Sequence, residues 1–122
     1  MPIIDVEIVC EAETEFGKFS AQPLADAIGK VLGNEAGRAW VRLRFLNRHS
    51  YAENLSTLDS TELPAFVTVL HAQLPVGDAL TTEVSAITMA VAQCLARAPE
   101  RVHVQYAPAA AGRQAFGGKL VL

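Results

Sequence analysis

The 122-residue sequence lacks the features that mark several broad classes of protein. Its apolar runs are too short to cross a bilayer, and its N-terminus lacks the basic and apolar regions of a secretory signal. Its two cysteines, Cys10 and Cys94, are too few for a disulfide framework, and no CxxC or Cys/His cluster marks a zinc or redox site. We therefore expect a cytoplasmic protein without a membrane partner, a metal or another cofactor.

Motifs of common enzyme classes are missing as well. The sequence contains no G-x-S-x-G, no P-loop and no dinucleotide-binding glycine fingerprint. Its net charge of −3 argues against a nucleic-acid partner. The charges are unevenly placed, with acidic residues first and basic residues after them: Asp5, Glu7, Glu11, Glu13 and Glu15, then Lys30, Arg38, Arg42, Arg44 and Arg48. A basic patch on an acidic protein suits a small anionic ligand.

Hydrophobic periodicity predicts three elements in the first part of the chain. Residues 2–9 alternate along their length, which indicates a strand with one buried face. Apolar residues at helical spacing predict a helix from about Ser20 to Leu32, ended by Gly33. Residues 39–46 alternate again and predict a second strand.

The same order of elements then repeats. We expect a strand over residues 64–71, a helix over about 78–96, a strand over 101–106 and a tail strand within 115–121. A single domain, residues 1–122, would then consist of repeat 1 at about 2–48, a polar loop at 47–63 and repeat 2 at about 64–122. Two β-α-β units predict an α+β fold with one four-stranded sheet and both helices on one face. Because the other face and the tail strand stay uncovered, we also expect an oligomer.

Three features together resemble the tautomerase superfamily. They are the Met1-Pro2 start, the repeated β-α-β unit and the junction from Leu95 through Pro99-Glu100-Arg101-Val102 to Tyr106. The chain is most similar to longer, fused-repeat members of the macrophage migration inhibitory factor type. The resemblance implies a homotrimer with active sites near subunit interfaces. It also implies an isomerase whose N-terminal proline moves a proton between carbon and oxygen.

Pro2 is the candidate catalytic base, provided that Met1 is removed. An exposed α-amine titrates near 7.7–8.0, and burial lowers that value by disfavouring the charged form. A neutral secondary amine in a rigid ring is then a competent base at pH 7. Two alternatives stay open: a proline that merely starts a strand, and a retained Met1 that leaves the nitrogen as an amide without useful basicity.

Five further residues are candidate substrate ligands. Arg42 and Arg44 lie two positions apart on a strand, so they project from one face and could grip a carboxylate. The resemblance places Arg42 where short tautomerases carry a substrate-binding arginine. It places His103 and Gln105 where the migration-inhibitory-factor group has a tyrosine and an asparagine near the site, and Phe116 where that group has an aromatic wall. The alternatives are a solvated charged face, structural hydrogen bonds and core packing.

Several expected cationic residues are absent from this sequence. Glu11-Ala12-Glu13 stands where short tautomerases have an arginine, and Gln73-Leu74-Pro75-Val76 where the dehalogenase and decarboxylase branches have theirs. Asn34 falls near a lysine of the migration-inhibitory-factor group. These departures argue against a dicarboxylate substrate and weaken dehalogenation or decarboxylation. Two hypotheses remain: a proline-dependent tautomerase of a small anionic carbonyl substrate, and a non-catalytic trimeric binding or structural protein.

Overall fold

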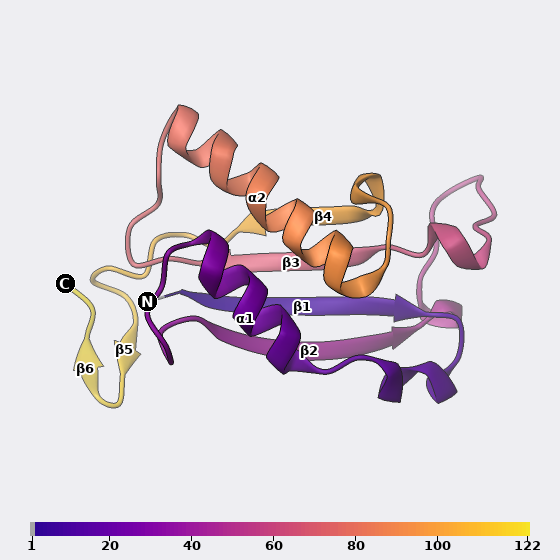
Figure 1. Cartoon of the computed structure of the whole chain (residues 1–122), viewed down its shortest axis with the longest axis horizontal. Coiled ribbons are helices and arrows are strands. Elements are labelled where there is room, and N and C mark those ends of the chain that lie inside the picture. Colours follow the sequence, from indigo (N-terminus) through magenta and orange to yellow (C-terminus); the bar gives the residue numbers. More distant parts are fainter. Residues whose placement is uncertain (1) are drawn as a thin grey trace.

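The structure, a computed structural model, describes residues 2–122 and contains one four-stranded mixed sheet (Figure 1). Its strands are β1 (Ile3–Cys10), β2 (Trp40–Asn47), β3 (Ala65–Leu70) and β4 (Val102–Tyr106), in the order β2-β1-β3-β4. Within each repeat the two strands are parallel, whereas β1 and β3 pair antiparallel. The helices α1 (Ala21–Val31) and α2 (Asp78–Leu95) cross the same face of the sheet. The predicted α+β fold of two β-α-β units is therefore confirmed.

The core lies between this helix-covered face and the two helices. Alternate side chains of a strand point to opposite faces, so the fully buried Ile4, Val6 and Ile8 of β1 all face the helices. They pack with apolar residues of the other core elements, among them Ala65, Val67, Val69, Leu24, Ile28, Ile87 and Val91. The period-two and helical patterns in the sequence therefore identify the core face of each element.

Residues with positive φ end or open the two helices. Gly33 follows α1 with φ of 68°, and Gly77 precedes α2 with φ of 60°. Ala96 caps α2 in the left-handed conformation with φ of 53°, which strains a residue that has a Cβ. The helix therefore stops before Pro99, within one residue of the predicted end.

Two segments differ from the prediction. The connection at residues 10–19 contains the 3-10 helix η1 (Glu13–Lys18), which brings Phe16 against Phe45 with ring centroids 4.9 Å apart. The predicted tail strand is wrong, because the tail folds back on itself as a hairpin of β5 (Ala115–Phe116) and β6 (Lys119–Leu120). Gly117 and Gly118 both have positive φ, as a two-residue hairpin turn requires.

Shorter 3-10 helices lie in the loops and at the start of β4: η2 (Arg48–Ser50), η3 (Ser60–Glu62) and η4 (Pro99–Arg101). Among residues 2–122, no helix is long and apolar enough to cross a membrane. No helix of this part of the chain covers the second face of the sheet, called the bare face below (Figure 1).

Candidate functional site

Pro2 lies fully buried at the head of β1. Its carbonyl accepts a 3.1 Å hydrogen bond from the backbone N–H of Trp40, which attaches it to β2. On the other side, the β1–β3 ladder ends where Ile3 pairs with Leu70, so Pro2 and His71 each lie one residue beyond it. Pro2 and Ile4 share the helix-covered face, because they lie two positions apart. The predicted removal of Met1 concerns a residue outside the described range.

An aromatic pair stands beside the Pro2 end of the sheet. The Trp40 and Phe116 rings meet edge to face, with centroids 5.3 Å apart, and the Trp40 indole donates a 2.9 Å hydrogen bond to the Gly37 carbonyl. Phe116, predicted as an aromatic wall, thus approaches this end from the C-terminal hairpin. Trp40 was not among the predicted site residues, although a large aromatic residue at the head of a strand is a usable signal.

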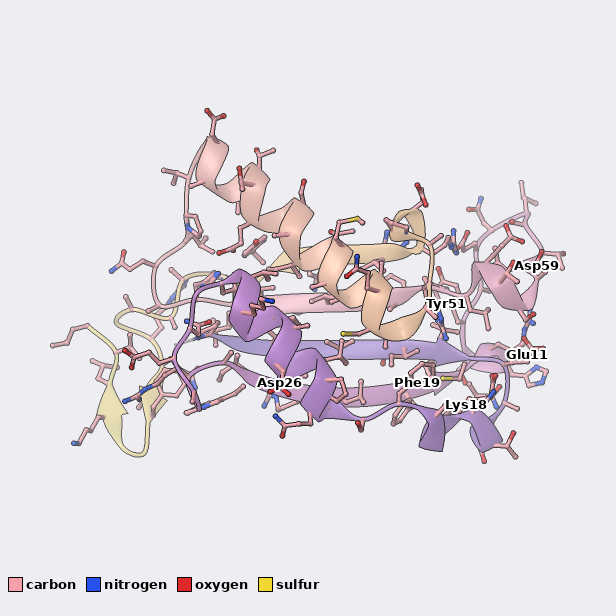
Figure 2. All side chains as sticks on the ribbon, in the orientation of Figure 1. Glu11, Lys18, Phe19, Asp26, Tyr51 and Asp59 are labelled. Carbon is pink, nitrogen blue, oxygen red and sulfur yellow. The ribbon has the colours of Figure 1, made fainter. Side chains whose placement is uncertain are left out.

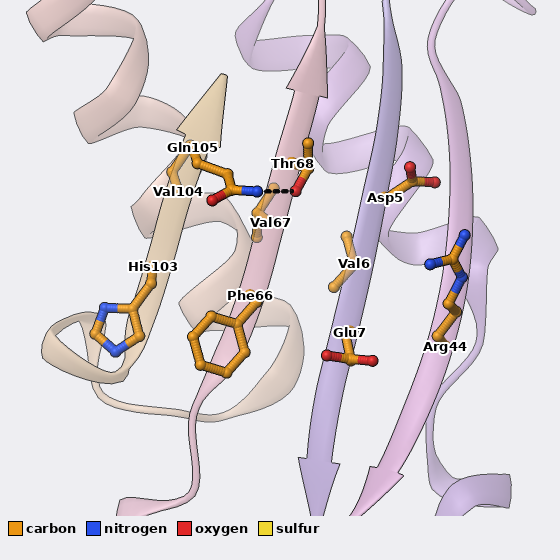
Figure 3. A pocket seen from close by; sticks show the side chains of 10 residues that line it. All are labelled: Asp5, Val6, Glu7, Arg44, Phe66, Val67, Thr68, His103, Val104 and Gln105. Atoms are coloured by element: carbon orange, nitrogen blue, oxygen red, sulfur yellow. Dashed lines mark hydrogen bonds between the residues drawn. The ribbon is translucent and has the colours of Figure 1, made fainter. Parts of the chain in front are cut away.

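A cavity of about 490 Å³ opens on the bare face (Figure 3). It is lined by Asp5, Val6, Glu7, Arg44, Phe66, Val67, Thr68, His103, Val104 and Gln105. Gln105 donates a 3.1 Å hydrogen bond to the Thr68 hydroxyl, and the His103 and Phe66 rings lie 5.5 Å apart. The structure therefore brings three of the predicted ligands together: Arg44, His103 and Gln105.

Arg42 shares that face but is engaged by its own chain. Its Nε and Nη2 donate to the two oxygens of Asp5 at 2.6 and 2.8 Å. These hydrogen bonds, with the charge of Asp5, raise the pKa of the Arg42 guanidinium. The two arginines do project from one face as predicted, but Arg44 lines the cavity and Arg42 forms a bidentate ion pair with Asp5.

Pro2 and the cavity lie on opposite faces of the sheet. The Pro2 ring is on the helix-covered face at the strand end, whereas Arg44, His103 and Gln105 project from the bare face. In the part of the chain described, one subunit does not bring Pro2 together with these three residues.

Three side chains at the Pro2 end form a network that sequence analysis missed. Glu83 of α2 accepts hydrogen bonds at its Oε2 from His71 Nε2 at 2.9 Å and from the Tyr106 hydroxyl at 2.7 Å. The rings of His71 and Tyr106 stack, with centroids 6.0 Å apart. Burial, together with the hydrogen bond to Glu83, raises the pKa of Tyr106. We call these three residues the Glu83 network.

A second network of similar form lies at the opposite end of the sheet. Glu53 accepts hydrogen bonds at its Oε2 from the Tyr51 hydroxyl at 2.6 Å and from Arg101 Nη2 at 2.5 Å. The Tyr51 bond, followed by the Arg101 bond, lowers the pKa of Glu53. Figure 2 shows Tyr51 at this end, near Glu11 and Asp59. We call these three residues the Glu53 network.

No family model matches the sequence, nor does any curated protein. Solved structures do match. A fused 4-OT, solved as a symmetric trimer, shares 14% identity at a TM-score of 0.74, covering 98% of this chain and 94% of its own. Pt0534 inactivated by 2-oxo-3-pentynoate shares 13% identity at a TM-score of 0.73, covering 97% and 94%.

A macrophage migration inhibitory factor homologue from Prochlorococcus marinus shares 14% identity at a TM-score of 0.65, covering 97% of each chain. All three are tautomerase-superfamily structures. The chain therefore has the tautomerase-superfamily fold, and the resemblance predicted from the sequence is confirmed at that level.

Proposed function

We propose that this protein is a tautomerase that uses the Pro2 amine, freed by removal of Met1, as its general base and acid. The observation that carries the proposal is the complete burial of Pro2 at the head of β1, in a fold shared with tautomerase-superfamily structures. A buried neutral amine can take a proton from the carbon beside a carbonyl and return it elsewhere on the enolate. The negative charge that develops on the oxygen then needs a hydrogen-bond donor.

The proposal includes a homotrimer. The fused 4-OT match is a symmetric trimer, and within the sheet described here β2 and β4 each have a neighbouring strand on one side only. Unpaired edges and a bare polar face favour association with further copies. In such an assembly a neighbouring subunit would supply Arg44, His103 and Gln105 to the Pro2 site, with Phe116 as its aromatic wall.

We propose a substrate with a single carboxylate. Arg44 lines the cavity, whereas Arg42 already holds Asp5 through two hydrogen bonds. One cavity arginine can bind one carboxylate, and a dicarboxylate would need a second cation. A small enolisable carbonyl acid such as phenylenolpyruvate or a 2-hydroxyenoate fits this charge. Arg42 is then a sheet-bracing residue rather than the ligand that the resemblance implied.

The second candidate is a trimeric binding or structural protein without activity. The Arg42–Asp5 pair favours it, because one of the two expected cationic ligands is occupied within the chain. The two candidates share the fold and differ in the state of the Pro2 nitrogen. A cytoplasmic location stays a prediction for both.

The test begins with the intact mass of the natively expressed protein, which shows whether Met1 is absent. The processed protein is then treated with 2-oxo-3-pentynoate, the compound that inactivated Pt0534. The Pro2 nitrogen would add to the alkyne, forming one C–N bond while a proton moves to the adjacent carbon, and nothing leaves. We expect one adduct, on the N-terminal peptide, with loss of phenylenolpyruvate turnover.

Pro2→Ala should lower kcat/KM for phenylenolpyruvate by about a hundredfold or more, because general base catalysis is worth roughly that factor. Glu53→Gln, at the far end of the sheet, is the matched control and should retain turnover. Unchanged turnover in Pro2→Ala would refute Pro2 as the base, whereas a native protein that keeps Met1 and shows no turnover would leave the non-catalytic candidate.

A further inference from the structure

Glu83 sits where three elements meet at the Pro2 end of the sheet. It belongs to α2, His71 directly follows β3, and Tyr106 is the last residue of β4. The side chains of His71 and Glu83 are only 14% and 16% exposed. A carboxylate withdrawn from water needs hydrogen-bond donors, and Glu83 has two on one oxygen. The network therefore fastens α2 to the ends of two strands.

The β1–β3 register determines where the Glu83 network lies relative to Pro2. The β1–β3 ladder ends with the Ile3–Leu70 pair, and one further step in the same register would bring Pro2 level with His71. Val69 is fully buried under the helices, and His71, two positions on, points to the same side. Directly opposed side chains in antiparallel strands have Cβ atoms about 5 Å apart. His71, which is hydrogen-bonded to Glu83, therefore lies between Glu83 and Pro2.

The C-terminal segment contacts His71 and Trp40, the two residues next to Pro2 on the neighbouring strands. The His71 carbonyl accepts a 2.8 Å hydrogen bond from the Ala110 N–H, and Ala110 is buried. From there the chain leads to the hairpin, whose Phe116 meets Trp40, and Trp40 binds the Pro2 carbonyl. Contacts therefore run from Pro2 through the hairpin and back to the Glu83 network. The Glu83 side chain is itself only 16% exposed, so water screens its carboxylate less than it would a surface charge.

We propose that Glu83 is a positioning residue of the Pro2 site, which holds His71 beside Pro2 through a hydrogen bond and supplies a negative charge that favours the protonated amine. This inference rests on the proposed function, because it needs a free Pro2 amine. Burial disfavours the ammonium, and a nearby carboxylate favours it. The balance keeps the amine able both to accept and to donate the transferred proton near neutral pH.

Other ionisable groups at this end are less able to act on the amine. Arg38 precedes β2, Asp78 begins α2, Lys30 ends α1, and Arg113 and Lys119 belong to the C-terminal segment; all five residues are exposed. Salt and water screen exposed charges. His71, Glu83 and Tyr106, by contrast, are partly buried at this end and are joined to one another by hydrogen bonds.

The test is a titration of the Pro2 nitrogen by NMR in protein labelled with 15N-proline. Once Met1 is gone, Pro2 carries the one secondary amine among the six prolines of the chain. We expect Glu83→Gln to lower the pKa of this amine by about half a unit to one unit, as a carboxylate several ångströms away would raise it. Tyr106→Phe removes a hydrogen-bond donor but no charge, so it should change the pKa of the Pro2 amine by less than about 0.2 unit.

Glu53→Gln is the matched control, because Glu53 also accepts from two donors but lies at the other end of the eight-residue β1, on the order of 20 Å away. It should leave the Pro2 titration unchanged. If Glu83→Gln does not fold, Glu83→Met removes the same charge while filling a similar volume beside the two rings, with the same expected shift.

The outcomes separate the two proposals. A wild-type protein without a titrating proline nitrogen overturns the proposed function and, with it, this inference. If the Pro2 amine titrates but its pKa is unchanged or higher in the folded Glu83 variant that lacks the charge, the inference alone is overturned. The inference is also overturned if the pKa of the Pro2 amine falls by the same amount in the Glu83 variant and in Tyr106→Phe. The fall would then come from the lost Tyr106–Glu83 hydrogen bond and not from the charge of Glu83.

Discussion

The two ends of the sheet carry the same arrangement of hydrogen bonds with a different charge balance. In each, a glutamate oxygen accepts from a tyrosine hydroxyl and from one nitrogen donor. The nitrogen donor of Glu53 is Arg101, which is always cationic. The donor of Glu83 is His71, which is neutral when it carries a proton on Nε2 alone. Glu53 is therefore paired with a permanent cation, whereas Glu83 is paired with an imidazole, which is cationic only when it is protonated.

The difference in charge balance matches the different surroundings. Arg101 also donates to the Glu62 carbonyl, so the Glu53 network fastens the polar loop to the start of β4. The Glu83 network instead lies under α2, on the face where Pro2 is buried. One set of contacts braces a loop, and the other lies at the end of the sheet that carries the proposed Pro2 base.

Charge reversal at the two glutamates should give the largest difference in the free energy of unfolding between the two networks. Glu83→Lys would set an ammonium in a largely buried place without a carboxylate to pair with it there, and we expect it to lower the free energy of unfolding by about 3 kcal/mol. Glu53→Lys, opposite Arg101 in a more hydrated place, should lower it less. Urea unfolding measures both. A larger loss in Glu53→Lys would mean that burial does not distinguish the two ends.

Removing the tyrosine hydroxyls is a milder comparison. Tyr106→Phe should cost about 1 kcal/mol, because it removes one hydrogen bond to a largely buried carboxylate. Tyr51→Phe should cost less, since Arg101 still holds Glu53. Urea midpoints at one protein concentration provide the measurement, and equal losses would contradict the proposed asymmetry.

The smallest expected effect is the acid dependence of the Glu53 network. The pKa of Glu53 lies below its ordinary value of 4.5, first because Tyr51 donates to it and next because Arg101 does. A lowered folded-state pKa gives stability that is fully present above the unfolded value and is lost as pH falls through the folded value. The stability difference between wild type and Glu53→Gln should thus be constant from pH 7 to 5 and shrink below 4.5. A difference that grew on acidification would reverse the assigned sign.

Sequence analysis predicted the elements well because burial imposes a period on them. The alternation in residues 2–9 and 39–46 identified β1 and β2 within one residue of their ends. Period alone gives the face of a residue and not its partner across the sheet. The Arg42–Asp5 pair depends on the β1–β2 register, which sets Asp5 opposite Arg42. A residue predicted to bind substrate is therefore found bound within the chain.

The candidate site was predictable only in part for the same reason. Pro2 could be named from its place at the head of a strand, and Arg44, His103 and Gln105 from their shared face. The Glu83 network joins residues from three elements, 12 and 23 positions apart along the chain, so no local pattern marks it. The prediction for the tail was wrong for a different reason: Gly117 and Gly118 reverse the chain where a single strand was predicted.

The strand order also has a consequence for how the chain folds. Each repeat closes its own parallel pair over a single crossover helix, whereas the halves meet along one antiparallel ladder, β1 against β3, and where α1 packs on α2. Short loops cost less entropy to close than long ones, and local contacts speed folding. Each β-α-β unit can therefore fold before β1 pairs with β3 and joins the two halves. Pro2, at one end of that ladder, acquires its opposing strand only when the halves have joined.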